Sequence, residues 1–146
     1  PPPKTPRRQR QMCIRDSNHI TLAVSNVEHS LDFYTRVLGF EGEVKWEKGA
    51  YLSIGELWLC LSLDSPCPKT DYSHIAFNVA EEDFATLCEH LKKHKAEQWK
   101  SNQSEGSSVY ILDPDGHKLE IHCGSLESRL KSLKSKPYRG LKWLKP

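Results

Sequence analysis

The sequence lacks any apolar run that approaches the roughly 18 to 20 residues needed to cross a bilayer as a helix. It also lacks the continuous apolar stretch near the N-terminus that a secretory signal peptide has. Its five cysteines form an odd set without a CxxC or comparable spacing, so reduced thiols fit best. These absences favour a cytoplasmic protein that does not associate with membranes.

The chain also has little net charge. Its formal value of +2 at pH 7 depends on residues 1–17, where five basic residues stand against Asp16 alone, so the remainder carries −2. Without a global basic field, the body of the protein has no general attraction for nucleic acid. Any anion that it binds must be held by a local cluster of residues.

Hydrophobic residues make up 37% of the 146 residues, which is enough for one domain or two very small ones. Residues 1–17, PPPKTPRRQRQMCIRDS, carry no hydrophobic period, and a strand pattern begins abruptly at Asn18. We interpret residues 1–17 as a disordered segment that is foreign to the domain and resembles translated library-linker sequence. The alternative is a basic tail with a biological role.

A weak internal repeat organises the rest of the chain. NHITLAV at residues 18–24 matches SHIAFNV at residues 73–79, an offset of 55 residues. Both segments alternate, which predicts strands that place His19 and Thr21 on one face and Leu22 on the other. His74 is placed in the second copy as His19 is in the first.

An amphipathic helix is expected after each of these strands. The first is predicted over Val27 to Leu38, with Gly39 as its C-terminal cap. The second begins with three acidic residues, Glu81 to Asp83, and ends among lysines, as the helix dipole favours. Three short strands separated by Gly turns then follow each helix.

The pattern therefore predicts an α+β fold made of two tandem βαβββ modules. We expect the first module over residues 18–66 and the second over residues 67–124, with Pro66 and Pro68 marking the linker. Residues 125–146 are expected to form a short helix and an extended tail that packs on a neighbour.

Three residues at equivalent strand positions form a candidate metal site, namely His19, His74 and Glu120. Two His and one carboxylate leave half of an octahedral shell open, which suits Mn(II) or Fe(II) better than structural zinc. A single His in a strand is more often a core or surface residue than a ligand. Two His at matched positions of a duplicated unit are a stronger indication of ligation.

The residues alone leave the choice of the third ligand open, because Glu120 and His122 lie on one strand face two residues apart. In the first module, the position that matches Glu120 is expected near Leu59, within a residue or two. That copy supplies no fourth ligand, so coordination positions stay open for substrate.

The segment from Lys100 to Tyr110, KSNQSEGSSVY, is dense in hydroxyls, carbonyls and amides. This composition suits a hard cation or an anionic ligand, although a solvated hairpin loop is the plainer interpretation of composition alone. The adjacent DPDG, Asp113 to Gly116, is a turn signature to which we assign no catalytic role.

Several segments together resemble one enzyme family. The stretches NHITLAV, GAYLSIGELWLCLS, DYSHIAF, WKSNQSEGSSVYILDPDGHKLEIH and SLESRL are similar to glutathione-dependent fosfomycin resistance transferases of the vicinal-oxygen-chelate superfamily. The serine-rich loop with its flanking Lys and Tyr is characteristic of this branch. The resemblance implies the vicinal-oxygen-chelate fold and an enzyme that adds the glutathione thiol to the epoxide of fosfomycin, inactivating the antibiotic.

The resemblance also implies which residues form the site. It assigns Mn(II) to the two His and Glu120, which favours Glu120 over His122, and it makes Thr21 and Tyr51 the candidate catalytic residues. Potassium is implied at Asn102, Ser104, the Gly106 carbonyl and Ser108. The residues implied in substrate binding are Thr21, Trp58, Cys60, Tyr72, Lys100, Ser104, Tyr110 and Arg129.

These residue types suit that reaction. Opening an epoxide leaves a developing alkoxide, which a divalent metal stabilises as a Lewis acid. Charge-assisted hydrogen bonds from Lys or Arg anchor the phosphonate beside the metal. A hydroxyl such as that of Tyr51 is expected to assist the deprotonation or orientation of the thiol.

The family forms domain-swapped homodimers, which implies that His19 and Thr21 act in trans to His74 and Glu120. An isolated monomer is then expected to be inactive. The loop departs from the family at Gln103, where an Arg often stands near the thiol entrance. This departure concerns the affinity for glutathione and not the metal site.

Other functions share parts of this site. A fosfomycin hydrolase, or a transferase that uses another thiol, keeps the metal and phosphonate sites and is separated by product analysis with and without glutathione. A non-catalytic protein of this fold would bind the drug stoichiometrically, whether or not a chelator is present. A dioxygenase shares the metal ligands, but it gives no purpose to Lys100, Arg129 and the serine-rich loop.

Overall fold

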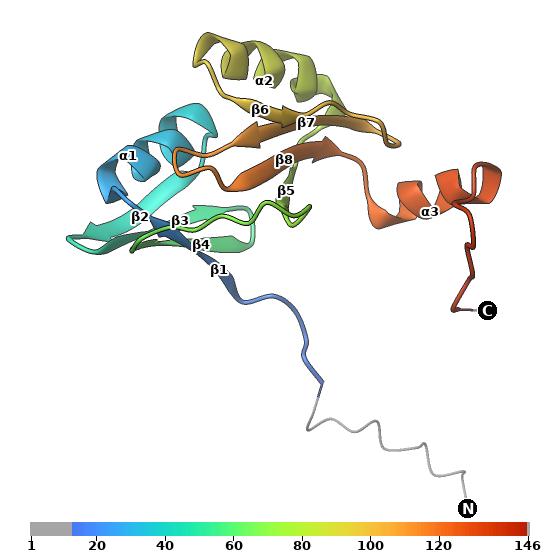
Figure 1. Cartoon of the computed structure of the whole chain (residues 1–146), viewed down its shortest axis with the longest axis horizontal. Helices are drawn as coiled ribbons and strands as arrows, with labels where there is room; N and C mark the ends of the chain where they lie inside the picture. Colours follow the sequence, from blue (N-terminus) through green and yellow to red (C-terminus); the bar gives the residue numbers. More distant parts are fainter. Residues whose placement is uncertain (1–12, 146) are drawn as a thin grey trace, which may run out of the picture.

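The computed structural model describes residues 13–145, in which two four-stranded sheets each carry a helix on one face (Figure 1). The first module contains β1 (His19–Val24), α1 (Val27–Asp32), the short π-helix η1 (Phe33–Val37), β2 (Glu41–Trp46), β3 (Gly49–Ile54) and β4 (Leu57–Leu63). The second contains β5 (Ile75–Asn78), α2 (Glu81–Lys93), β6 (Gln98–Lys100), β7 (Ser107–Leu112) and β8 (Lys118–Cys123). A last helix, α3, spans Leu126–Ser135.

The two sheets have the same topology. Their strand orders are β1-β4-β3-β2 and β5-β8-β7-β6, and in each sheet the first strand pairs in parallel with the last. The remaining neighbours pair antiparallel. This arrangement confirms the α+β fold of two βαβββ modules, whereas the exact module limits of 18–66 and 67–124 stay a prediction.

The first helix differs from the single α-helix expected over residues 27–38, because after α1 it continues as the π-helix η1. The Thr35 hydroxyl donates to the Leu31 carbonyl oxygen at 2.7 Å, a side-chain bond of the kind that disturbs the regular α-helical ladder. Gly39, with a φ of +78°, ends the segment as the sequence predicts. The second helix begins and ends close to its predicted limits.

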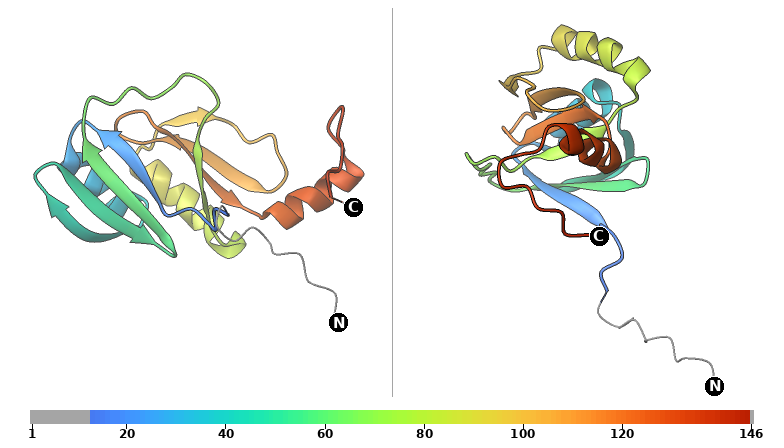
Figure 2. Two further views of the ribbon diagram at one scale, coloured as in Figure 1. Left: turned by 90° about the horizontal axis from the view of Figure 1, so that it is seen from below. Right: turned by 90° about the vertical axis from the view of Figure 1, so that its right-hand side faces the viewer.

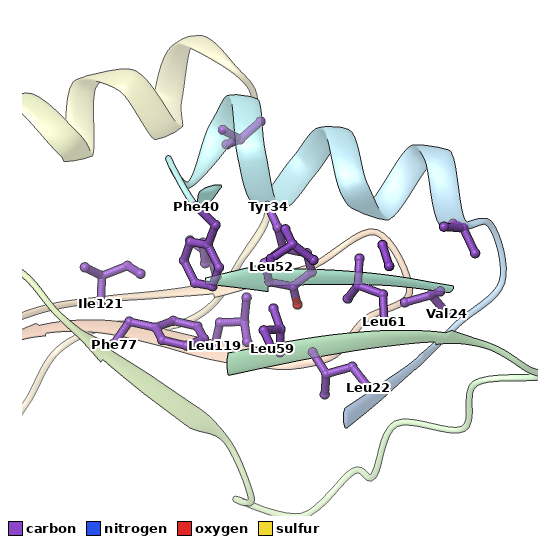
Figure 3. Packing of buried hydrophobic residues seen from close by; sticks show 14 of the residues in the cluster. Leu22, Val24, Tyr34, Phe40, Leu52, Leu59, Leu61, Phe77, Leu119 and Ile121 are labelled. Atoms are coloured by element: carbon purple, nitrogen blue, oxygen red, sulfur yellow. The ribbon is translucent and has the colours of Figure 1, made fainter. Parts of the chain in front are cut away.

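One hydrophobic core joins the two modules (Figure 3). Leu22 and Leu61 of the first sheet and Leu119 of the second belong to the same buried cluster. Phe40 and Phe77 meet between the modules in edge-to-face geometry, with ring centroids 5.0 Å apart. Because alternate residues of a strand point to opposite sides, the other face of each sheet carries the polar and aromatic side chains.

The DPDG turn of the second module docks on the first module. The Tyr34 hydroxyl donates to Asp113 Oδ2 at 2.8 Å in a buried position, and the Ser25 hydroxyl donates to Asp115 Oδ1 at 2.5 Å. Burial raises the pKa of Asp113 above its usual range. The turn identified from residue type therefore also links the modules, a role that its sequence alone does not reveal.

We expect Tyr34→Phe to lower the free energy of unfolding by about 1.5 to 3 kcal/mol, since it removes a donor from a buried carboxyl group. Urea denaturation measures the change. In an Asp113→Ala background the same substitution should cost clearly less, because its partner is already gone. An equal cost in both backgrounds would mean that the Tyr34 hydroxyl does not stabilise the fold through Asp113.

The two ends of the described chain lie outside the two-sheet body. Residues 13–17 are exposed and form no helix or strand, while the rest of the segment interpreted as disordered and foreign, residues 1–12, lies outside the described residues. Helix α3 projects from the end of β8, away from the first module (Figures 1 and 2). Between residues 13 and 145, no helix is long and apolar enough to cross a membrane.

Candidate functional site

The polar face of the first sheet holds the site residues expected from the first module. On β1, His19 and Thr21 are exposed while Leu22 is buried, so the alternation follows the prediction. Thr21 lies beside Cys60 of β4 in the parallel register, and Tyr51 of β3 lies opposite Cys60 on its other side. These residues therefore share one face of the sheet.

Aromatic rings extend across this face from His19. The His19 and Trp58 ring centroids are 4.5 Å apart, Trp58 and Tyr51 are 5.1 Å apart, and Tyr51 and Trp46 are 4.8 Å apart. Trp58 remains 37% exposed and Trp46 remains 44% exposed. A face with this much uncovered aromatic surface suits contact with a ligand or with another chain.

The strand registers identify equivalent positions of the two modules. Glu120 lies beside Ala76 in the parallel pair and opposite Tyr110 in the antiparallel pair. Cys60 has the same relation to Thr21 and Tyr51. Cys60 is therefore the counterpart of Glu120. It lies one residue beyond Leu59, the position expected from the sequence to within a residue or two.

Both sheets also contain a bulge at the same place. The pairing shifts between Gly42 and Val44 in β2 and between Gln98 and Lys100 in β6. A bulge re-aims the side chains that follow it, and here it sets Lys100 opposite Tyr110. The duplicated fold thus places a lysine on the second face where the first face has Val44.

On the second face, His74 and Glu120 come together. His74 Nε2 lies 3.2 Å from Glu120 Oε1, and the carboxylate is nearly buried, with 8% of Glu120 exposed. Glu120 Oε2 accepts a hydrogen bond from the Ser108 hydroxyl at 3.1 Å. The carboxylate is thereby fixed through one oxygen while the other faces the imidazole.

The hydrogen bonds of both candidate His ligands suit metal binding. His74 Nδ1 lies 2.8 Å from the Tyr72 carbonyl oxygen, and His19 Nδ1 lies 2.7 Å from Asn18 Oδ1. Because these oxygens can only accept, each Nδ1 donates to its oxygen and Nε2 is the nitrogen turned toward the site. In His74, Nε2 lies within hydrogen-bond distance of a carboxylate oxygen, and a cation that displaces the proton between them would find two donor atoms side by side.

The third candidate ligand lies on the other sheet of the same chain. Within residues 13–145 of one chain, no group of three or more His, Cys, Asp or Glu side chains is arranged to hold a metal ion. The structure therefore brings His74 and Glu120 together but not His19 with them.

His122, the alternative to Glu120, is partly buried and lies close to the Glu120 carboxylate. Its Nδ1 lies 2.5 Å from the Ser108 hydroxyl and 3.5 Å from Glu120 Oε2. A Cβ atom at Gly106 would lie 2.8 Å from the His122 ring, and one at Gly124 would lie 2.6 Å from it, so both glycines permit its close packing. Glu120 is therefore the one of the two whose oxygen lies next to His74 Nε2, and its role as the third ligand stays a prediction.

Lys100 stands beside this pair. Its Nζ donates to the Tyr72 hydroxyl and lies 4.4 Å from the centre of the Tyr72 ring and 4.9 Å from that of Tyr110. The hydrogen bond to Tyr72 raises the pKa of Lys100 above its usual range. A permanent positive charge is therefore held next to Glu120 and His74, as anion binding requires.

The loop after Lys100 is ordered by its own polar groups. The Asn102 amide donates to the Gly106 carbonyl at 2.8 Å, and Asn102 Oδ1 accepts from the Ser104 hydroxyl at 3.1 Å. Arg129 of α3 donates to Ser104 Oγ at 3.4 Å and to Glu105 Oε2 at 3.2 Å. Three of the predicted potassium ligands thus share one loop, and Arg129 reaches it from the helix.

The fourth predicted potassium ligand, Ser108, lies on β7, with its hydroxyl directed to Glu120 and His122. Its assignment to potassium stays a prediction. Trp99 has no role in the sequence-based prediction, yet its ring centre lies 5.6 Å from that of His74 and 5.2 Å from that of Tyr110. The bulge that places it there leaves no recognisable pattern in the sequence.

Comparisons with known proteins agree with this architecture. A model of the Glyoxalase/Bleomycin resistance protein/Dioxygenase superfamily matches residues 17–121. Glutathione transferase FosA of Serratia marcescens is 48% identical over 133 residues, which cover 88% of this chain and 94% of that protein. Metallothiol transferase FosB of Staphylococcus haemolyticus is 38% identical over 133 residues, with 86% and 96% covered.

Solved structures give the same result. The fosfomycin resistance protein FosX of Listeria monocytogenes, complexed with Mn(II) and sulfate ion, has a TM-score of 0.73 and 31% identity, with 82% of this chain and 98% of that chain covered. FosX of Mesorhizobium loti has a TM-score of 0.71 and 27% identity, with 81% and 99% covered. The chain belongs to the Glyoxalase/Bleomycin resistance protein/Dioxygenase superfamily and, within it, to the Fos proteins.

Proposed function

We propose that this protein is a fosfomycin resistance enzyme, a metal-dependent transferase that adds the thiol of glutathione to the epoxide of the antibiotic. The observation that carries the proposal is the pairing of His74 Nε2 with Glu120 Oε1 at 3.2 Å beside the cation of Lys100. A metal site next to an anion site suits a small substrate with an epoxide and a phosphonate. The 48% identity to the Serratia glutathione transferase supports this substrate and this thiol.

The metal is proposed to be Mn(II), held by His74 and Glu120 of one chain and His19 of a second copy. When bound, it supplies Lewis-acid stabilisation of the negative charge that develops on the epoxide oxygen. The remaining residues bind and orient the substrates. Ser108 and the Tyr72 carbonyl hold Glu120 and His74 in position through the hydrogen bonds described above.

Anion-binding residues are proposed to anchor the phosphonate. Lys100, Ser104, Tyr110 and Arg129 belong to the second module and α3, and Thr21 comes from the first module of the second copy. The Arg129–Ser104 contact at 3.4 Å and the position of Lys100 over Tyr110 support this grouping. Trp58 and Cys60 then form the apolar wall beside the epoxide, and Tyr72 lies at its edge.

In the reaction, the sulfur of glutathione attacks an epoxide carbon, so that a C–S bond forms while the C–O bond of the ring breaks. The thiol proton is lost before or during attack, and the ring oxygen finally carries a proton as a hydroxyl group. No protein nucleophile is needed. Tyr51, on the same face as Trp58, is proposed to orient or deprotonate the thiol.

Potassium is proposed to bind the loop through Asn102, Ser104, the Gly106 carbonyl and Ser108, adding positive charge near the phosphonate.

The residue ranges 18–66 and 67–124 are proposed as the two modules, and 125–146 as the C-terminal helix and tail. We propose a homodimer in which modules of different chains face each other. The exposed Trp58 and the projecting α3, with Leu126 74% exposed, support such an association.

The test is an assay of purified protein with fosfomycin, glutathione, Mn(II) and potassium, in which the adduct is followed by mass spectrometry or ³¹P NMR. We expect adduct that depends on both the thiol and the metal and that disappears with a chelator. If fosfomycin stays unchanged with every thiol and is not hydrolysed by water either, the proposal of an enzymatic function is wrong. A second arm of the assay replaces glutathione with other low-molecular-weight thiols. It tests the alternative that the enzyme uses another thiol, which Gln103 and the 38% identity to a metallothiol transferase favour.

Lys100→Ala is expected to raise the KM for fosfomycin by roughly 10- to 100-fold, because one charge-assisted hydrogen bond to the phosphonate is lost. The affinity for Mn(II) should change little, since Lys100 is not a ligand. Steady-state kinetics and a metal titration of the same preparation measure the two effects. Lys93→Ala, a change on the exposed side of α2, is the matched control. An unchanged KM would remove Lys100 from the phosphonate site.

A further inference from the structure

The linker between β4 and β5 runs from the first sheet to the second (Figure 2). Lys118 of β8 binds the end of this linker. Its Nζ donates to the carbonyl oxygens of Thr70 at 3.1 Å and Asp71 at 2.5 Å. The same ammonium group lies 5.3 Å from the centre of the Trp99 ring. Lys118 therefore joins two successive linker carbonyls to the aromatic group that surrounds His74.

The residue after these carbonyls, Tyr72, touches both halves of the candidate site. Its carbonyl accepts from His74 Nδ1 at 2.8 Å, and this hydrogen bond orients the imidazole so that Nε2 faces Glu120. Its hydroxyl accepts from Lys100 Nζ. A shift of Tyr72 would thus move the acceptor that orients a metal ligand and the partner of an anion-binding lysine together.

The linker has no regular secondary structure to hold this position. Residues 64–74 form neither helix nor strand, and Tyr72 is 57% exposed. A cavity of about 300 Å³, lined by Pro68, Ser73 and Lys118 among others, lies against the segment. The two hydrogen bonds from Lys118 act directly on the linker backbone, whereas Lys100 and the His74 ring contact the side chain of Tyr72.

We propose that Lys118 is a positioning residue of the metal and phosphonate sites, acting through Thr70, Asp71 and Tyr72. Without its ammonium group the Tyr72 carbonyl is held less firmly, and the hydrogen bond that orients the His74 ring toward Glu120 is weakened. The inference rests on the proposed function for its substrate. Its effect on His74 does not depend on that substrate.

The test compares Lys118→Met, which keeps the length of the side chain, with Lys118→Arg, which keeps the charge and the donors. Mn²⁺ binding to metal-free protein is measured by EPR, and the exchange of the His74 Nδ1 proton with solvent is recorded by NMR without metal. We expect Lys118→Met to raise the Mn²⁺ Kd by about 10- to 100-fold and Lys118→Arg to restore most of the affinity. The His74 Nδ1 proton of Lys118→Met should exchange faster than that of the wild type, because its hydrogen bond to the Tyr72 carbonyl is weaker.

Two further variants separate the effect of the Tyr72 hydroxyl on Lys100 from the effect of the Tyr72 carbonyl on His74. Tyr72→Phe removes the hydroxyl and keeps the carbonyl, so it should raise the KM for fosfomycin and leave the Mn²⁺ Kd unchanged. Lys93→Met, a lysine replacement on the exposed side of α2, should change neither. Lys118→Gln takes the place of Lys118→Met, with the same expected results, if the methionine variant fails to fold.

The inference is wrong if Lys118→Met binds Mn²⁺ within about twofold of the wild type and keeps the wild-type exchange rate of the His74 Nδ1 proton, because supporting residues of this kind change affinity by at least tenfold. A wild-type protein that binds no Mn²⁺ would contradict the proposed function instead. The exchange rates of the metal-free variants would still decide whether Lys118 acts on His74.

Discussion

Replacement of Glu120 by alanine is expected to lower kcat/KM for fosfomycin by about 1000-fold, because a lost metal ligand removes several kcal/mol of transition-state stabilisation. Glu120 supplies the only carboxylate of the proposed ligand set, and its Oε1 lies 3.2 Å from His74 Nε2. The Mn²⁺ Kd, measured by EPR, should rise in parallel. Circular dichroism and the melting temperature establish that the variant is folded.

The matched control is His122→Ala, because His122 is two residues away on the same strand face. It contacts Ser108 and lies 3.5 Å from Glu120 Oε2, so its loss should weaken metal binding by about 10-fold, as for other residues behind a ligand. A larger loss in His122→Ala than in Glu120→Ala would reverse the two roles. The pair of variants therefore decides between the two side chains that the sequence pattern leaves open.

The repeated fold could be predicted because its signals are local. The alternation in NHITLAV and SHIAFNV determines which side of β1 and β5 faces the core, and two strands with the same spacing to an amphipathic helix indicate a duplication. The positions of His19 and His74 on the polar faces follow directly. The Gly39 helix end and the acidic first turn of α2 also depend on neighbouring residues only.

The remaining features depend on contacts between residues far apart in the chain. The bulge before Lys100, the match of Cys60 with Glu120 and the docking of Asp113 on Tyr34 all follow from strand register and packing. Neither periodicity nor composition carries that information. For the same reason the sequence pattern assigns no role to Lys118, whose partners lie in the linker and in β6.

The two modules have diverged to complementary chemistry on one scaffold. The second face carries Glu120 and Lys100, where the first has Cys60 and Val44 at matching positions. One face is therefore ionic and the other is largely apolar and aromatic. This difference between the faces suits the proposed site, in which an anionic end and an uncharged epoxide end of one substrate would contact faces of different modules.

Mixing two inactive variants is expected to restore activity, because each proposed site combines His19 of one chain with His74 and Glu120 of the other. Chains carrying His19→Ala and chains carrying Glu120→Ala are each expected to be inactive. In a heterodimer both substitutions fall in one site, and the other site keeps all three wild-type ligands. With random pairing, about a quarter of all sites become complete, so about a quarter of wild-type activity should return.

The recovery requires exchange of subunits, so the chains are unfolded together and refolded at equal concentration, and activity is compared with that of each variant refolded alone. A mixture of Glu120→Ala with His74→Ala is the matched control, because both residues come from the same chain. In that mixture every site lacks one ligand, and no activity should return. Recovery in the control but not in the first mixture would contradict the proposal. It would mean that His19 and Glu120 of a site come from one chain and His74 comes from the other. No recovery in the first mixture, with heterodimers present by mass spectrometry, would contradict the division of the three ligands between two chains.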